Sequence, residues 1–259
     1  MIPICLAFNL LLMATSCLSI SLPEEINKCH FGAEKCIIDS MNHVIKKYPK
    51  GIPKIGLKPI DVVDIRDSIL IETDQSGPIW MSLNLTKQII YGFENTTITE
   101  VEGFEKDPTA QHLTISGRIP SLIHKGHYCA RRHILLITMD LKGESTSDFQ
   151  NLRFTLKLKG TIEFRNNKRY LKIYELVPNV KIDRWILWMQ DLFEENTDLT
   201  NLVNRLFNIR WLEVWNELEA KILEIFSGLF LGMIKETFEN NSYDDMFLPD
   251  LTETQENAL

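Results

Sequence analysis

The spacing of apolar residues changes twice along the chain, and each change predicts a different kind of element. Residues 34–48 carry apolar side chains at helical spacing, and Pro49 and Gly51 follow them as stop signals. From about residue 62 to residue 193, apolar and polar residues alternate, with turn residues between the runs. This is typical of antiparallel strands with one buried face. The pattern therefore predicts a short helix followed by a large sheet.

The clearest alternation covers residues 152–165 and predicts one unusually long strand. At ~3.3 Å per residue this strand extends for roughly 45 Å, so the sheet must curl around something. Asn166 and Asn167 predict a tight turn, because asparagine tolerates a positive φ. Residues 170–180 then predict the strand that returns beside the first one.

The C-terminal part of the chain is predicted to be helical from Trp211 onwards. Trp215, Ile222, Phe226 and Met233 belong to one broad apolar face, while charged residues lie largely elsewhere. About 28 residues give a rod of about 42 Å, which matches the long strand. The predicted fold class is therefore α+β, with a long C-terminal helix wrapped by a strongly curved antiparallel sheet, because each must bury its apolar face.

The first 23 residues contain no Asp, Glu, Lys or Arg, and residues 4–14 form an apolar run followed by small residues. We therefore expect residues 1–21 to be a cleaved signal peptide of a secreted, extracellular protein. An uncleaved anchor stays open, because no Lys or Arg precedes the run. The longest apolar run elsewhere, residues 222–234, is shorter than the ~20 residues that span a bilayer, so no stable membrane insertion is expected. The domain is predicted over residues 22–249, and a disordered acidic tail over residues 250–259.

An oxidising compartment favours a disulfide between Cys29 and Cys36, which lie close together in the sequence. Such a short loop contributes roughly 2–3 kcal/mol to stability in the chain-entropy model. Cys129 is then left unpaired. We expect it to be a buried thiol, with an intermolecular bridge as the alternative.

Three triplets of the N-glycosylation type begin at Asn84, Asn95 and Asn240. In a secreted chain each asparagine is expected to carry a glycan, provided that it faces water.

Composition and charge narrow the classes of function. With 44% apolar and 24% charged residues, the chain can bury a sizeable core, which excludes intrinsic disorder. Its 28 Lys and Arg against 35 Asp and Glu give a net charge of −7. Nucleic-acid binding needs the opposite balance, so no nucleic-acid partner is expected.

The sequence contains no nucleophile elbow, zinc-protease helix, phosphate-binding glycine loop or dinucleotide fingerprint. Residues 124–133 include three histidines and a cysteine, but their spacing matches no zinc site. Asp61, Asp64 and Asp67 recur every third residue, and an exposed strand edge explains them better than an acid–base pair. No catalytic residue, metal site or cofactor is therefore expected.

Several short motifs lie in order along nearly the whole predicted domain. They are Cys29 with Cys36, KGIPKIGLKPID at 50–61, GHY at 126–128 with ILL at 134–136, YLKI at 170–173, FNIRW at 207–211 with EL at 217–218, and SYDDMF at 242–247. Together these motifs resemble the takeout and juvenile-hormone-binding protein family of insects, which are secreted carriers with the tubular lipid-binding fold. Arg132, Thr138 and Leu141 depart from the family hairpin, and a second disulfide of the hormone carriers is missing, so the chain looks closer to the takeout branch.

The resemblance implies an internal hydrophobic tunnel between helix and sheet, and inward-facing apolar residues are its candidate lining. For each single residue, ordinary core packing is the alternative. Tyr128, Tyr174 or a histidine is the candidate for meeting a polar end group of a ligand. The candidate lining residues are Trp80, Phe93, Phe104, Met139, Phe154, Phe164, Tyr174, Trp215, Phe226 and Phe230.

The predicted function is that of a secreted, monomeric carrier. It would bind a small elongated hydrophobic ligand, such as a terpenoid hormone, a fatty acid or a related lipid, without converting it chemically. The alternative is a secreted interaction protein with a vestigial or permanently filled cavity, which acts through its outer surface on an unidentified receptor or carrier partner.

Overall fold

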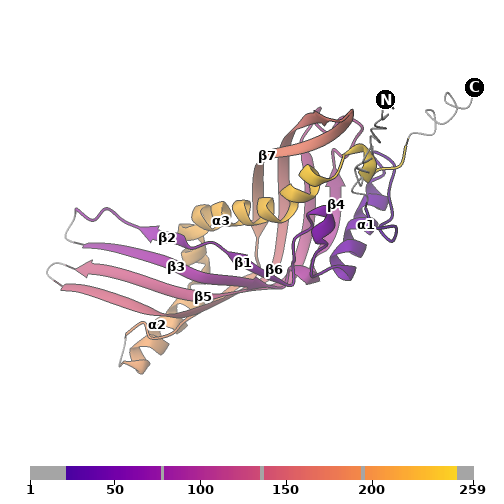
Figure 1. The fold of residues 1–259 in the computed structure, drawn as a ribbon. Helices are drawn as coiled ribbons and strands as arrows, with labels where there is room; N and C mark the ends of the chain where they lie inside the picture. The colour runs from indigo at the N-terminus through magenta and orange to yellow at the C-terminus, as the bar shows by residue number, and fades with distance from the viewer. Residues whose placement is uncertain (1–21, 77–78, 135–136, 194–195, 250–259) are drawn as a thin grey trace, which may run out of the picture.

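In a computed structural model of the chain, a bent antiparallel sheet folds around a long C-terminal helix (Figure 1). The structure describes residues 22–76, 79–134, 137–193 and 196–249. The predicted signal peptide and acidic tail lie outside these residues. Within them, every helix is too short or too polar to cross a membrane.

The helices and strands follow one another in a simple order, with three short 3-10 turns between them. Their bounds are α1 Glu34–Lys47, η1 Pro53–Ile55, β1 Val62–Ile65, β2 Ser68–Glu72, β3 Ile79–Tyr91, η2 Phe93–Asn95, β4 Thr97–Glu102, β5 Leu113–Ile134, β6 Ile137–Arg165, β7 Lys168–Lys181, β8 Arg184–Met189, α2 Thr197–Ile209, α3 Trp211–Asn240 and η3 Asp244–Met246.

The sheet is organised around β5 and β6, and β5 pairs over its whole length with residues 137–158 of β6. At one end β3 adds to β5 and β8 adds to β6, and β1 and β2 both pair with β3. At the other end β4 adds to β5 and β7 adds to β6. We call the first end, together with α2, the α2 half, and the second end, together with α1, the α1 half. In Figure 1 the strands of the α2 half extend to the left, and those of the α1 half run roughly upright at the right.

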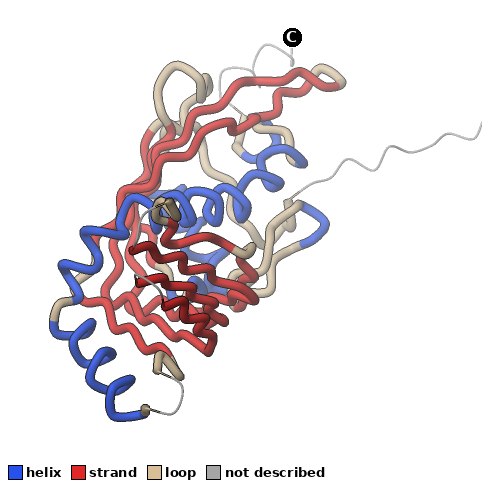
Figure 2. The backbone as a smooth tube through the Cα atoms, turned by 90° about the vertical axis from the view of Figure 1, so that its left-hand side faces the viewer, coloured by secondary structure: helices blue, strands red, loops and turns tan. Residues whose placement is uncertain are grey.

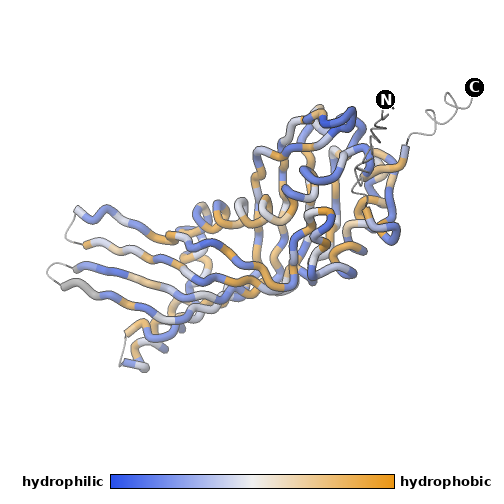
Figure 3. Tube along the Cα trace, viewed as in Figure 1, coloured by the Kyte–Doolittle hydropathy of each residue, from blue (hydrophilic) through white to orange (hydrophobic). Residues whose placement is uncertain are grey.

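The long strand and the long helix predicted from the sequence are confirmed. β6 has 29 residues, about twice the predicted length, and α3 has 30 residues. Asn166 and Asn167 both have a positive φ, 51° and 60°, at the turn into β7. Alternation of hydrophobic and hydrophilic residues is visible along the strands of the α1 half (Figure 3).

α3 supplies the centre of the core to both halves. Trp215 and Ile222 are buried in its N-terminal half, Phe226 and Phe230 near its middle, and Phe238 near its C-terminal end. Figure 2 shows α3 lying across the sheet, with α2 leading into it. α2 begins after Asn196, whose side chain accepts a hydrogen bond from the Leu199 N–H at 2.9 Å and so caps the helix.

The predicted disulfide between Cys29 and Cys36 is confirmed and ties the entry of α1 to its first turns. The Cys29 carbonyl accepts a hydrogen bond from the Leu248 N–H at 2.8 Å, so the two ends of the domain meet beside α1. The prediction that Cys129 is a buried thiol is wrong. Cys129 is exposed, because the inward-facing positions of this part of β5 are His124 and Tyr128, at even sequence numbers.

Candidate functional site

Two apolar cavities lie along α3, one in each half of the molecule, and each has a volume of about 300 Å³. The α2-side cavity is lined by residues of β2, β3, β5, β6, β8, α2 and the N-terminal part of α3. The α1-side cavity is lined by residues of α1, η2, β5, β6 and the C-terminal part of α3. Their volumes fall at the lower end of the range for small-molecule sites.

Aromatic rings stand where the two cavities approach each other. Phe226 lines the α2-side cavity and Phe230, one helical turn later, lines the α1-side cavity, with ring centroids 6.2 Å apart. Phe149 packs on Phe226 at 5.8 Å, and Phe154 packs on Phe230 at 5.4 Å. We call these four residues the aromatic partition. They are held by packing rather than by covalent or hydrogen bonds.

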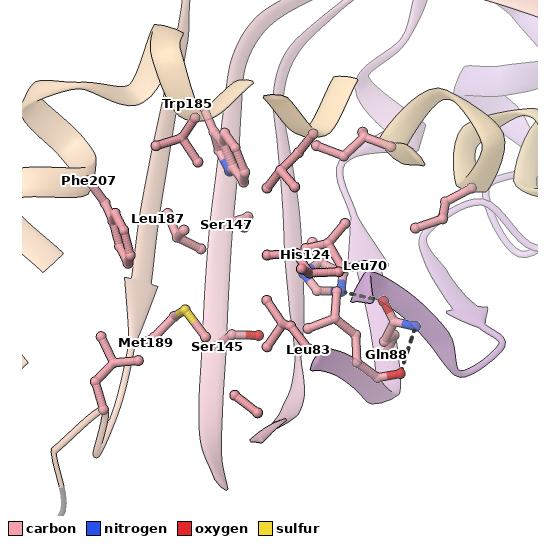
Figure 4. A pocket seen from close by; sticks show the side chains of 18 of the residues that line it. Leu70, Leu83, Gln88, His124, Ser145, Ser147, Trp185, Leu187, Met189 and Phe207 are labelled. Atoms are coloured by element: carbon pink, nitrogen blue, oxygen red, sulfur yellow. Dashed lines mark hydrogen bonds between the residues drawn. The ribbon is translucent and has the colours of Figure 1, made fainter. Parts of the chain in front are cut away.

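The α2-side cavity contains polar side chains in an otherwise apolar wall. Gln88, His124, Ser145 and Ser147 are all buried and all line it (Figure 4). The His124 Nε2 and Gln88 Oε1 atoms are 3.0 Å apart. Burial lowers the pKa of His124 to about 4, so the imidazole is neutral at physiological pH.

A β-bulge aims Gln88 into the cavity. The pairing of β3 with β5 shifts between Thr86 and Ile89, and Lys87 adopts a positive φ of 49°. The Lys87 N–H donates to Asp67 Oδ1 at 3.1 Å, which holds the bulge from outside. Gly126 lies opposite, where a Cβ atom would come within 3.2 Å of Gln88 Cγ.

Four of the predicted lining residues lie in the wall of the α1-side cavity, namely Phe93, Phe104, Phe154 and Phe230. Phe226 lies in the wall of the α2-side cavity.

The other predicted lining residues lie elsewhere or are not described. Trp215 is buried behind the cavity wall, with its ring 6.1 Å from that of Trp185. Trp80 is half-buried near the start of β3 and stacks on His133 at 5.6 Å. The side chain of Met139 lies outside the described residues.

The prediction that Phe164 and Tyr174 face the interior is wrong. Their side chains are 75% and 60% exposed. Tyr174 is the extra residue of a β-bulge, because Lys159 pairs with Glu175 and Gly160 already pairs with Ile173. Phe164 lies next to the β6–β7 turn, where the hairpin projects beyond the core (Figure 1). An alternating pattern cannot show where the covering layer ends.

Among the polar groups that sequence analysis considered, His124 is the one that lines a cavity. The Tyr128 hydroxyl donates to the Gln190 carbonyl, and burial raises the pKa of Tyr128 to about 12. Gln88, Ser145 and Ser147 were missed by the sequence analysis. The two serines occupy inward-facing positions of β6, so the two-residue period of the strand could have identified them. The bulge at Gln88 interrupts this period and leaves no clear pattern in the sequence.

The three predicted glycosylation asparagines, Asn84, Asn95 and Asn240, are all exposed. This meets the structural condition for modification, and their glycosylation stays a prediction. Among the described residues, no group of three or more His, Cys, Asp or Glu side chains is arranged to hold a metal ion. Within the histidine-rich segment, His124 faces inward, while His127 and Cys129 are exposed.

Known proteins match this chain over most of its length. Residues 8–248 match the family model "Haemolymph juvenile hormone binding protein (JHBP)". The chain is 21% identical over 228 residues to the "Circadian clock-controlled protein daywake" of Drosophila yakuba and, equally, to that of Drosophila melanogaster. Each alignment covers 87% of this chain and 88% of the relative. Among solved structures, Takeout 1 of Epiphyas postvittana has the same fold, with a TM-score of 0.69 and 19% identity over 83% of this chain and 96% of that one.

Proposed function

Because the chain belongs to the haemolymph juvenile hormone binding protein family, which includes the takeout proteins, we propose that it is a secreted carrier of a small elongated hydrophobic ligand. The ligand is held between α3 and the sheet and is released unchanged. The observation that carries the proposal is the pair of apolar cavities that follow one another along α3. A terpenoid hormone, a fatty acid or a related lipid fits this arrangement.

The aromatic partition gives the ligand two ways to bind. A short ligand fills one cavity, whereas a longer one displaces the rings of the aromatic partition and occupies both. The second arrangement is the tunnel that the family resemblance implies.

Burial of apolar surface supplies enough free energy for a carrier. About 400 Å² of hydrocarbon surface at ~25 cal/mol/Å² gives on the order of 10 kcal/mol before the costs of association. The walls supply this surface mainly with Leu, Ile, Val, Met and Phe side chains. Apolar contacts of this kind can hold a ligand reversibly without changing it chemically.

Secretion is supported by the apolar N-terminal run and by the disulfide, which persists best in an oxidising compartment. The exposed Asn84, Asn95 and Asn240 are proposed glycan sites of the secreted protein. We expect the carrier to act as a monomer.

The proposal is tested on protein secreted from eukaryotic cells. Extraction with organic solvent and mass spectrometry should find a copurified lipid, and a fluorescent fatty acid should bind and be displaced by a terpenoid ester. Leu218 faces the α2-side cavity, while Leu212 lies on the same helix and is 54% exposed. Leu218→Trp should weaken binding by filling the cavity, and Leu212→Trp should leave it unchanged.

Failure to find, load or exchange any apolar molecule would refute the carrier function. It would favour a secreted interaction protein that acts through its outer surface on a receptor or carrier partner.

A further inference from the structure

A row of polar side chains crosses neighbouring strands on the inner wall of the α2-side cavity. Gln88 comes from β3, His124 from β5, Ser147 from β6 and Trp185 from β8. His124 pairs directly with Ser147. Ser147 pairs with Leu187, which places Trp185 diagonally across from it on the same face. Directly opposed Cβ atoms lie about 4.5–5.5 Å apart and diagonal neighbours about 7–8 Å apart, so these side chains are neighbours on one face of the sheet.

The hydrogen bonds of Gln88 fix the orientation of the His124 ring. The Gln88 amide nitrogen donates to the Arg66 carbonyl at 2.7 Å and lies 3.1 Å from Ser68 Oγ. A carbonyl oxygen can only accept, so the amide nitrogen faces that side and Oε1 faces His124. The His124 Nε2 atom must then carry the proton that it donates to Oε1. In the neutral ring this leaves Nδ1 as an acceptor.

Trp185 brings a donor to the same wall. Its side chain is 4% exposed, and among the residues that the structure describes, its indole Nε1–H has no hydrogen-bond partner. The ring packs against Phe149 at 5.6 Å and Trp215 at 6.1 Å, which keeps it in place. A buried polar group without a partner is costly, and a ligand that supplied an acceptor would remove this cost.

We propose that Trp185, Ser147 and His124 form the subsite for an uncharged oxygen group of an amphipathic lipid, such as the carbonyl of an ester or ketone or the hydroxyl of an alcohol. A carbonyl oxygen accepts from Trp185 Nε1 and from the Ser147 hydroxyl. An alcohol, in addition, donates to His124 Nδ1. The hydrocarbon chain of the lipid extends toward the aromatic partition. This proposal rests on the carrier function and adds the chemical class of the ligand.

The row suits an uncharged group better than a carboxylate. The cation that lines the cavity, Arg132, lies eight residues from His124 along β5, which is about 26 Å at ~3.3 Å per residue. The Arg132 guanidinium also lies over the Phe193 ring at 4.9 Å. A carboxylate beside Trp185 would therefore lose its water without gaining a cation.

The first test uses the wild-type protein and ligands of equal length. Pentadecane, 2-pentadecanone, 2-pentadecanol and pentadecanoic acid compete with a fluorescent apolar probe. The ketone and the alcohol should bind roughly three- to tenfold more tightly than the alkane, which is the usual net effect of one neutral hydrogen bond. The ¹³C-labelled carbonyl of the bound ketone should absorb at a lower infrared frequency than the same ketone in an alkane solvent. Equal affinities of ketone and alkane with an unshifted carbonyl band would overturn the proposal.

The second test removes single polar atoms. Trp185→Phe deletes the N–H, and Trp215→Phe is the matched control, since Trp215 belongs to the same aromatic cluster but does not line the cavity. Ser147→Ala is paired with Ser116→Ala, whose buried hydroxyl instead lies 3.0 Å from Thr155 Oγ1. Trp185→Phe and Ser147→Ala should abolish the preference for the ketone over the alkane, and both controls should keep it.

The outcomes separate this proposal from the carrier function. Binding of all four ligands with no preference for oxygen would leave the carrier function standing and refute the subsite. Tightest binding of the acid, lost in Arg132→Gln, would place the polar group at the other end of the cavity and would also refute the subsite. No binding of the probe or of any of the four ligands would refute the carrier function and, with it, the subsite. If the Trp185 variant fails to fold, the ligand series and the infrared band of the wild-type protein still test the subsite.

Discussion

The two cavities have the same volume of about 300 Å³ and share one helix, but their walls differ in chemistry. In the α2-side cavity, buried polar side chains belong to the strands themselves. In the α1-side cavity, polar side chains such as Ser40 and Thr237 already donate to backbone carbonyls, at 2.8 and 3.2 Å. The α1 half is also closed by the disulfide of α1. The comparison teaches that two cavities of equal volume along one helix can differ in the elements that supply their polar side chains.

The largest expected effect comes from removing part of the aromatic partition. Phe230→Ala deletes a buried ring that packs on Phe93 and Phe154, and should lower the free energy of unfolding by about 3–5 kcal/mol. It should also join the two cavities, so that longer ligands gain affinity over short ones. Urea unfolding and a series of ligands of increasing length test this. An unchanged dependence on ligand length would show that the partition does not limit the ligand.

Acid should affect the α2-side cavity through His124. Its pKa is about 4 in the folded protein, against about 6.5 when unfolded, so the unfolded state binds more protons between these values. The stability contribution is complete above pH 6.5 and is lost as the pH falls to 4, by about 3 kcal/mol in total. Urea unfolding at several pH values should show this slope in the wild type and less of it in His124→Gln. His127→Gln, on the exposed face of β5, is the control, and an equal change in both variants would contradict the assignment.

Breaking the disulfide should loosen the α1 half alone. Replacing Cys29 and Cys36 by serine should lower the free energy of unfolding by about 2–3 kcal/mol, as expected for a short loop. Hydrogen exchange should become faster in α1 and β4 and stay unchanged in α2 and β8. Exchange that rises equally in both halves would mean that the two ends unfold as one unit.

The smallest effect is expected at Phe164, one of the residues that sequence analysis placed wrongly. Phe164→Ser changes a side chain that is 75% exposed, so the free energy of unfolding should change by less than about 0.5 kcal/mol. Ligand affinity should stay the same. A loss comparable with that of Phe230→Ala would show that Phe164 is covered in solution.

Prediction from sequence succeeded where one period runs through a long element. α3 and β6 each bury one face against a single layer. Apolar residues such as Phe226 and Leu156 therefore recur at the helical or strand period and can be recognised in the sequence. The turn at Asn166 and Asn167 was predictable because few residues accept a positive φ. The family motifs led to the same fold.

The candidate site was harder to predict for physical reasons. An inward-facing residue can fill the core, as Trp215 does, or line a void, as Phe230 does, and the period is the same in both cases. The bulges at Gln88 and Tyr174 reverse the facing of a residue without a clear sequence signal. Ser145 and Ser147 are buried, but they are small and polar, so they interrupt the alternation of apolar and polar residues that marks the inner face of β6.

The hydrogen bond between Leu248 and the Cys29 carbonyl means that both ends of the folded domain leave it beside α1. A tag or surface anchor attached at either end would hold the molecule by this side and direct α2 outward. On immobilised protein the α2 half would then face the solution, whichever end was used for attachment.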